Sequence, residues 1–387
     1  MTQTIPCSEL QRGFEQGPIR PPSEAGSLLL RVSRNCSWNR CTFCPLYRDE
    51  AFSLRSAGEV MADIDAVAVH IHQLLEQSRK TELSAEILRR LHQRLPEEER
   101  ASFRAAAHWL MGDMQSVFLQ DADSLAAGAE VLLPILEHLR RTFPQVSRVT
   151  SYSRSATLVR YSLTDLQSLQ RAGLNRLHLG LESGSDQVLR RVRKGASKDL
   201  HVRAGQLVRA AGMELSVYVM PGLGGKVLSV EHARETAEVL NRINPHFIRL
   251  RTLAVPDETP LAEEMAAGRF EPCSAVEIAE ELLLLIESLS GIDSMVVSDH
   301  ALNLFEDLRG RLPDDKNSML ALLKTFLNLE DDQRCLYLVG RRVGYFRAIT
   351  NMQDPLRRAE VQKLCDDLGV TTDNVEAICR DLMKRFI

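Results

Sequence analysis

Apolar and polar residues alternate along several short segments of the chain, and longer segments with helical spacing separate them. The strand-length segments are 27–33, 116–120, 147–151, 174–180, 213–220 and 246–251. The segments between them keep apolar residues on one helical face, at about 128–141, 163–172, 185–211 and 230–241. A repeat of strand and helix predicts a parallel sheet with helices on its outer face.

The predicted strands alternate in polarity, whereas strands buried on both faces are apolar throughout. In 246–251, Ile248 and Leu250 share one face, and Arg249 and Arg251 share the other. The apolar face must meet the helices, so the polar face lines the inside of a barrel. We therefore expect an α/β fold, a partial (β/α)6-type TIM barrel of parallel strands with an open, wet interior. Barrels of this type carry their sites at the C-terminal ends of the strands.

The pattern changes on either side of the barrel. A long helical stretch follows the cysteine cluster, and its helical face is made of Val60, Ile64, Val67, Ile71, Leu74 and Leu75. A second, polar helical stretch at about 84–110 lengthens the connection after the first strand, and 294–298 is a candidate seventh strand or edge. Two helical stretches without strand alternation follow, at about 314–329 and 355–387. The expected division is an irregular lead at 1–26, a barrel at 27–310 and a small helical appendage at 311–387.

Composition excludes several classes of protein. The 387 residues include 48 Lys and Arg against 52 Asp and Glu, so the basic excess typical of a nucleic-acid binder is missing. No apolar stretch reaches the roughly 18 residues that a membrane span needs. The N-terminus has no basic segment followed by an apolar run, so we expect no signal peptide and a cytoplasmic protein without a membrane partner.

Three of the eight cysteines lie close together, directly after the first predicted strand. Cys36, Cys41 and Cys44 have the spacing C-x4-C-x2-C, which allows their thiolates to converge on one metal centre. Unrelated thiols are one alternative. A structural zinc site is another, but it needs four protein ligands, and the chain has no second C-x2-C or His pair. An iron–sulfur cluster commonly takes four thiolates, so three would leave one iron open to a small molecule.

The cysteine motif, with Phe43 before its last cysteine, resembles that of the radical S-adenosylmethionine (SAM) superfamily, whose usual spacing is C-x3-C-x2-C. The resemblance implies a [4Fe-4S] cluster on Cys36, Cys41 and Cys44, with SAM on the fourth iron. It implies reductive cleavage of SAM to a 5'-deoxyadenosyl radical that abstracts hydrogen from a small-molecule substrate. A reducing partner such as flavodoxin or ferredoxin would supply the electron.

Other motifs that resemble those of the family follow the cysteine motif, in the family's order, at the ends of the predicted strands. Asp121 and Asp123 follow the second strand, where family members carry a Gly-Gly-Glu-like turn that holds the SAM ammonium group. The glycines are missing here, so the two acids are substitutes for that turn. A helix N-cap is the alternative explanation for them.

After the fourth strand, the run from Gly180 to Ser185 resembles the branch of oxygen-independent coproporphyrinogen oxidases, Elongator-type acetyltransferases and tRNA methylthiotransferases. In that branch the residues matching Glu182 and Ser183 lie against SAM; taken alone, the run would be a helix cap on Ser185. After the fifth strand, the turn containing Met220 and Gly222 is implied to pack along the adenosine. The resemblance covers about residues 27–255.

The substrate must be inferred from the remaining residues. Arg249 and Arg251 are predicted to bind the SAM carboxylate or an anionic substrate, and internal ion pairs are the alternative. Asp299 and His300 follow the candidate seventh strand and are candidates for proton transfer after hydrogen abstraction, unless they merely cap a helix. The reaction is unidentified. The rival interpretation is a non-catalytic haem or iron–sulfur carrier of the same branch.

Overall fold

The computed structural model of the chain describes residues 13–383. Cys7, most of the first half of the predicted lead and the last four residues of the predicted appendage lie outside this range. The strands are β1 (Leu28–Arg31), β2 (Ser33–Arg34), β3 (Ser53–Leu54), β4 (Ser116–Gln120), β5 (Arg148–Ser153), β6 (Leu174–Glu182), β7 (Glu214–Val219), β8 (Phe247–Leu250), β9 (Met295–Val297) and β10 (Gly310–Arg311).

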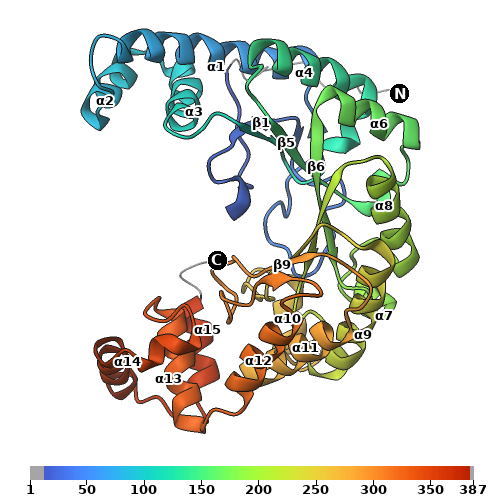
Figure 1. The fold of residues 1–387 in the computed structure, drawn as a ribbon, viewed down its shortest axis with the longest axis vertical. Helices are drawn as coiled ribbons and strands as arrows, with labels where there is room; N and C mark the ends of the chain where they lie inside the picture. The colour runs from blue at the N-terminus through green and yellow to red at the C-terminus, as the bar shows by residue number, and fades with distance from the viewer. Residues whose placement is uncertain (1–12, 384–387) are drawn as a thin grey trace. The chain divides into compact units, whose positions relative to one another are not determined.

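The described strands form one large sheet in the order β1-β4-β5-β6-β7-β8-β9-β10 and a small sheet of β2 and β3 (Figure 1). The pairs β1–β4, β4–β5, β7–β8 and β8–β9 are parallel, and β9–β10 is antiparallel. The mostly parallel sheet with its helices confirms the α/β partial-barrel fold. The candidate seventh strand is confirmed as β9, while the two-residue β10 was too short to predict from a pattern.

Helices connect the strands and follow them. They are α1 (Ala57–Ser78), α2 (Ala85–Arg94), α3 (Arg100–Leu110), α4 (Ala129–Thr142), α5 (Ser155–Leu158), α6 (Leu163–Ala172), α7 (Asp186–Arg191), α8 (Lys198–Ala210), α9 (Gly225–Ile243), α10 (Pro260–Ala266), α11 (Ala275–Ser288), α12 (Lys316–Leu327), α13 (Asp331–Arg342), α14 (Pro355–Asp367) and α15 (Val375–Met383). Short 3-10 helices are η1 (Pro22–Glu24), η2 (Glu97–Glu99), η3 (Ser124–Ala127) and η4 (Ile349–Gln353). Within residues 13–383, no helix is both long and apolar enough to cross a bilayer.

Two stretches that were predicted as continuous helices are each divided in the structure. The stretch at 84–110 divides into α2, η2 and α3, because Pro96 interrupts it. The stretch at 185–211 divides into α7 and α8, where Gly195 has a φ of +68° and Ser197 caps α8 by accepting from the Leu200 amide. The helices α10, α11 and α13 were not predicted.

Contacts divide the described chain into two compact units. The first contains the residues up to Ser37, Glu50–Ser153 and Ser162–Leu177, and the second contains Trp38–Asp49, Arg154–Tyr161 and the residues from His178 onward. In the first unit, α1 packs on α3 and α4. In the second, α9 packs on α8 and α11, and α13 packs on α14 and α15. The division into 27–310 and 311–387 stays a prediction.

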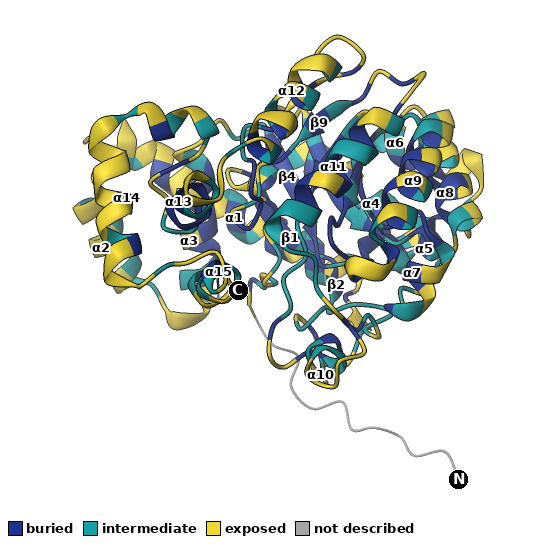
Figure 2. Cartoon of the chain, turned by 90° about the horizontal axis from the view of Figure 1, so that it is seen from below, coloured by how far each residue is buried: buried dark blue, intermediate teal, exposed yellow. Residues whose placement is uncertain are grey.

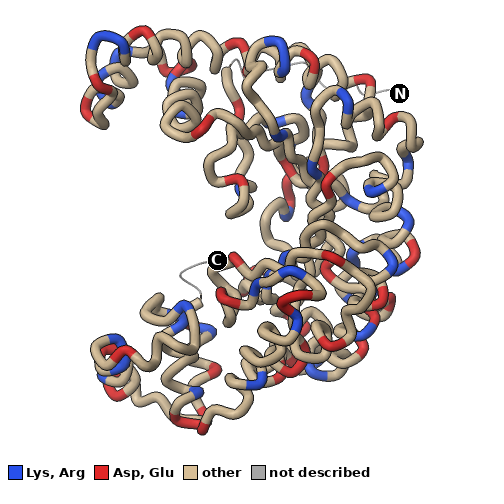
Figure 3. Tube along the Cα trace, in the orientation of Figure 1, with Lys and Arg blue, Asp and Glu red and all other residues tan. Residues whose placement is uncertain are grey.

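Burial and charge follow the layers of each unit. Figure 2 shows buried strands such as β4, while α14 turns most of its surface to solvent and buries only Val361 and Cys365. Lys and Arg are interspersed with Asp and Glu along both units (Figure 3). Along the trace of each unit, basic and acidic residues therefore alternate, in keeping with the balanced numbers of Lys and Arg against Asp and Glu.

The faces of β7 and β8 confirm the predicted strand alternation. Val217 and Ile248 are fully buried on the apolar face. On the opposite face, Arg249 Nε donates to Ser216 Oγ at 3.1 Å, and the ring of His178 packs edge-to-face on Tyr218. His178, Ser216 and Arg249 are all buried, so the expectation of a water-filled interior is wrong at this depth. Polar side chains fill the space because they bond to one another.

Candidate active site

The cysteine loop begins in the first unit, directly after β2. Cys36 is half-buried, and the next residue, Ser37, donates its hydroxyl to Asp123 Oδ2 at 2.6 Å. Ser153 Oγ donates to the other oxygen of this carboxylate at 3.2 Å. Asp123 makes no side-chain cap on η3, so the alternative N-cap explanation does not hold for it. Asp123 instead fixes the backbone beside Cys36.

Asp121 lies in the same buried turn. Its Oδ2 accepts from Arg31 Nε at 2.8 Å and lies 2.7 Å from Arg31 Nη2, and the Asn35 amide approaches the same oxygen at 3.4 Å. Asp121 and Asp123 therefore lie at the start of the cysteine loop, as the order of motifs predicted, but both carboxylates already have protein partners. A contact of either residue with the SAM ammonium group stays a prediction.

The second part of the loop, from Trp38, is fastened within the second unit. The Thr42 amide donates to Val192 O at 3.0 Å, and the Leu261 amide donates to Thr42 O at 3.1 Å. The Trp38 indole donates to Arg193 O at 2.7 Å. These bonds hold the loop between the end of α7 and the start of α10.

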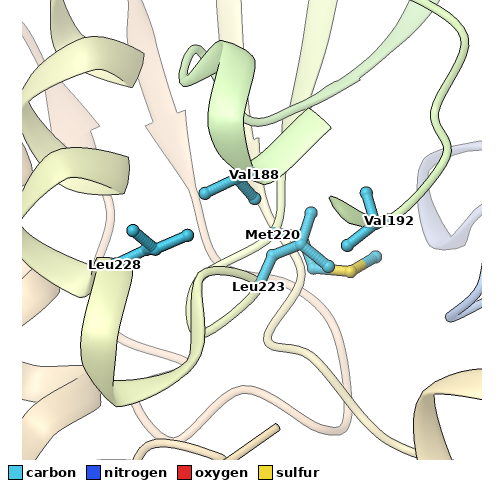
Figure 4. Packing of buried hydrophobic residues seen from close by; sticks show 5 residues of the cluster. All are labelled: Val188, Val192, Met220, Leu223 and Leu228. Carbon is cyan, nitrogen blue, oxygen red and sulfur yellow. The ribbon is translucent and has the colours of Figure 1, made fainter. Parts of the chain in front are cut away.

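Phe43 adds an apolar contact between the loop and the turn after β7. It packs against a buried cluster, which Figure 4 shows and which consists of Val188, Val192, Met220, Leu223 and Leu228. Met220 belongs to the turn predicted to pack along adenosine, while Val188 and Val192 come from α7 and its end. The cluster therefore fixes the distance between the cysteine loop and the Met220 turn.

Cys41 and Cys44 lie on one tight turn, whose Cys44 amide donates to Cys41 O at 3.3 Å. Arg48 Nη2 lies 3.3 Å from both Cys41 O and Cys44 O and donates to them. Arg48 therefore fastens the backbone of the turn that carries both thiols. In residues 13–383, however, no three His, Cys, Asp or Glu side chains are already arranged to hold a metal ion.

Lys194 is a residue that the sequence analysis missed. Its ammonium group lies 3.0 Å from Glu182 Oε1, and both side chains are largely buried. Burial alone lowers the pKa of Lys194, but the negative charges of Glu182 and Cys41 more than offset this and raise it. Lys194 therefore stays charged between the predicted SAM-binding carboxylate and a predicted cluster ligand. The only signal in the sequence was its place four residues before the start of α8.

The turn after β6 is strained and tightly packed. Glu182 has a φ of +65°, and its carbonyl accepts from the Met220 amide at 3.0 Å, so the turns after β6 and β7 are bonded directly. A Cβ on Gly184 would collide with the backbone of Glu235. Ser185 Oγ accepts from the Val188 amide at 3.1 Å and caps α7, as predicted for the run taken alone.

Two buried residues on helices, His232 of α9 and Glu281 of α11, hold these turns from behind. His232 Nδ1 lies 2.8 Å from Ser183 Oγ, and His232 Nε2 lies 3.1 Å from Met220 O. Glu281 Oε1 accepts from the Gly222 amide at 2.7 Å. The structure thus brings the four predicted residues Glu182, Ser183, Met220 and Gly222 into one network. His232 and Glu281, which complete the network, were not predicted.

The predicted arginines lead to a second group of residues. Arg249 Nη1 lies 2.7 Å from Asp299 Oδ2, so Arg249 makes an internal ion pair with Asp299. Arg251 lies just past β8 and is exposed, although its amide still donates to Val219 O.

His300 is held close to Arg251. Burial, reinforced by the Arg251 guanidinium, lowers the pKa of His300 to about 4, so the ring is neutral at pH 7. Its Nδ1 accepts from the Leu302 amide at 3.3 Å, which leaves the proton on Nε2. Asp299 and His300 thus lie beside the two arginines, and their part in proton transfer stays a prediction.

A mostly parallel α/β sheet with three cysteines on the loop after β2 is typical of a class of barrel proteins that hold a metal centre. The sequence profile of the Radical SAM superfamily matches residues 30–240, more than half of the chain. The chain belongs to the radical SAM superfamily. Enzymes of this superfamily use a [4Fe-4S] cluster and SAM.

Two curated relatives match parts of the chain. A tRNA uridine(34) acetyltransferase from Methanocaldococcus infernus is 24% identical over 118 residues, which is 30% of this chain and 22% of that protein. A 4'-phospho-dehydrooxetanocin synthase from Priestia megaterium is 26% identical over 195 residues, 50% of this chain and 23% of that protein. The chain thus spans less than a quarter of either relative. The match to the acetyltransferase agrees with the branch that the Gly180–Ser185 run resembles.

The solved structures similar to this chain include the coproporphyrinogen III oxidase of Escherichia coli. The two share 14% sequence identity with a TM-score of 0.43, over 68% of this chain and 52% of the oxidase.

Proposed function

We propose that Cys36, Cys41 and Cys44 hold a [4Fe-4S] cluster and that Glu182, Ser183, Met220 and Gly222 hold SAM beside it. The observation that carries the proposal is the fastening of the loop with Cys41 and Cys44 to the turns after β6 and β7. That fastening consists of the Thr42–Val192 bond at the end of α7, the helix that follows the β6 turn, and of Phe43 packed against the buried cluster that includes Met220. The thiol donor set suits an iron–sulfur cluster, and three thiolates leave one iron for SAM.

The residues of the chain would bind, orient and shield the cofactors. One-electron cleavage of SAM to methionine and a 5'-deoxyadenosyl radical is the chemistry that the bound cofactors supply. Lys194 pairs with the Glu182 carboxylate and holds it in place, so that Glu182 can accept hydrogen bonds from a cation. Phe43 and Met220 form an apolar wall that excludes water. Gly222 has a φ of +84° and a Cβ there would collide with Ile278, so only glycine allows the turn to pack this closely.

The remaining parts of the proposal concern partners. The substrate is a small molecule that loses a hydrogen atom, and the electron comes from a flavodoxin- or ferredoxin-like protein. A cytoplasmic location belongs to the same proposal. Asp121 and Asp123 support the loop beside Cys36. For either carboxylate to bond directly to SAM, it would have to give up a hydrogen bond or ion pair that it now makes.

The test is anaerobic reconstitution with iron and sulfide, followed by reduction in the presence of SAM. The wild-type protein should form 5'-deoxyadenosine, measured by chromatography. The variant with Cys36, Cys41 and Cys44 all changed to Ala should bind no cluster and form none, while the matched control Cys335→Ala, on α13, should behave as wild type. A protein that keeps its iron in the triple variant would contradict the ligand assignment. Intact cluster binding without any 5'-deoxyadenosine would favour a carrier instead.

A further inference from the structure

A cavity of about 270 Å³ lies in the second unit, beside the segment that follows β9. The charged and titratable residues that line it are Asp299, His300, Glu306, Arg341, Arg342 and Arg347. The first three follow β9, while the arginines come from the end of α13 and the loop after it. Three arginines against two carboxylates make the lining net positive.

Both carboxylates of this cavity are already neutralised. Asp299 pairs with Arg249 at 2.7 Å, and Glu306 pairs with Arg341 at 3.4 Å. Arg342 and Arg347, in contrast, form no ion pair with any carboxylate in the part of the chain that the structure describes. The cavity therefore contains two guanidinium groups without an ion pair among the described residues, although the charge of Glu376 acts on Arg342 without forming one.

Arg342 is the centre of this charge. Its Nη1 donates to Leu302 O at 2.8 Å, while its Nε is buried and has no hydrogen-bond partner among the described residues. Burial lowers the pKa of Arg342, since desolvation disfavours a charged group. A guanidinium held in this way gains stability when a carboxylate or phosphate arrives, because either accepts its planar pair of N–H groups.

The neighbouring histidine suits the same kind of ligand. The lowered pKa of His300 leaves its ring neutral at pH 7. The ring therefore contributes hydrogen bonding to the cavity but no charge. Because its Nδ1 accepts from the Leu302 amide, its Nε2 carries the proton and donates. A hydrogen-bond donor next to two unpaired guanidinium groups is an arrangement for binding an anion.

We propose that this cavity binds the anionic group, a phosphate or a carboxylate, of the enzyme's substrate. The anion site is inferred from the arginines alone. Only the identification of the anion as part of the enzyme's substrate rests on the proposed function. Asp299 and His300 follow β9, at the end of the strands where barrel enzymes place their sites. The site is thus on the correct side of the sheet for a reacting molecule.

A second cavity indicates the rest of the substrate. Arg342 also lines a cavity of about 400 Å³ that includes Gly222 and Thr252. Its apolar lining includes Leu253, Val255, Ile278 and Leu338, and its charged residues besides Arg342 are Arg380 and the acids Asp257, Glu258, Glu376 and Asp381. These acids disfavour a second anion there. A ligand anchored at Arg342 would therefore extend an uncharged, partly apolar body toward Gly222, where the proposed function places SAM.

The test uses the reconstituted enzyme with SAM bound and titrates inorganic phosphate or acetate by calorimetry at constant ionic strength. At least one anion should bind to the wild type, and its dissociation constant should rise at least tenfold in Arg342→Gln and in Arg347→Gln. The matched control is Arg357→Gln on α14, which should bind as wild type. Arg347 is exposed, so its variant decides the matter if Arg342→Gln fails to fold.

The outcomes separate the two proposals. The anion site is overturned if neither anion binds to the wild type, or if the Arg342 and Arg347 variants bind as tightly as the wild type. It is equally overturned if the control loses affinity to the same extent, since binding is then unspecific. Formation of 5'-deoxyadenosine without substrate is measured separately, in the wild type and in the Arg357→Gln control. Its absence from the wild type would reject the proposed function while leaving the anion site in place.

Discussion

Glu182 combines a left-handed backbone conformation, with a φ of +65°, and an ion pair to Lys194 at 3.0 Å. A residue other than glycine in this region is strained, and such strain is retained where the surroundings fix the conformation. Here the Met220 amide bonds to the Glu182 carbonyl, and Lys194 holds the carboxylate. The side chain is thus preorganised for one position, which is the property expected of a cofactor ligand.

We predict that Glu182→Gln weakens SAM binding about ten- to a hundredfold, because a charge-assisted hydrogen bond contributes roughly 1.5–3 kcal/mol. The iron content should be unchanged, since Glu182 is not a cluster ligand in the proposal. Equilibrium binding of SAM to the reconstituted variant measures the effect. Glu238→Gln, on the exposed side of α9, is the matched control. SAM affinity equal to that of the wild type would make Glu182 merely structural.

The sequence predicted Glu182 but not Lys194, and the reason is physical. The three cysteines are recognisable because their ligand chemistry requires a short spacing on one loop. Glu182 is recognisable from the run around it. Lys194 meets Glu182 only because α7 reverses the chain between them, and no spacing rule predicts that contact.

At the scale of elements, α9 and α11 support the site through single buried side chains. His232 of α9 bridges Ser183 Oγ and Met220 O, and Glu281 of α11 holds the Gly222 amide. Neither helix needs to contact SAM to affect its binding. The two residues are positioning residues, because they act through the turns after β6 and β7.

We predict that His232→Leu lowers the free energy of unfolding by about 1–3 kcal/mol, because it leaves buried polar atoms of Ser183 and Met220 without their partner. It should also raise the SAM dissociation constant while the iron content stays that of the wild type. Urea unfolding and SAM titration measure the two effects separately. His72→Leu on the exposed face of α1 serves as the control. If stability falls but SAM affinity does not, His232 supports the fold without positioning the site.

The continuity of helices was the least predictable property at this scale. The break between α7 and α8 depends on Gly195, where an added Cβ would collide with the ring of Trp38. Trp38 belongs to the cysteine loop, more than 150 residues earlier in the chain. The apolar pattern of 185–211 therefore predicted one continuous helix. The break is required only by tertiary packing, which this pattern does not contain.

At the scale of the whole molecule, the sheet and its alternation were predictable because they follow from a repeat of two residues. The filling of the interior was not. Arg249 was placed correctly on the polar face, but its partner Asp299 lies fifty residues later, beyond two helices that the pattern did not predict. A polar face could thus be recognised from the sequence, whereas its burial depended on partners from distant elements.

The central claim is that three cysteines hold a cluster with one iron open to SAM. Electron paramagnetic resonance of the reconstituted and reduced protein, recorded with and without SAM, tests it most directly. The account predicts about four iron atoms per chain and a reduced-cluster signal that changes when SAM is added. A protein that takes up zinc instead of iron, or a cluster signal that SAM leaves unchanged, would contradict the account.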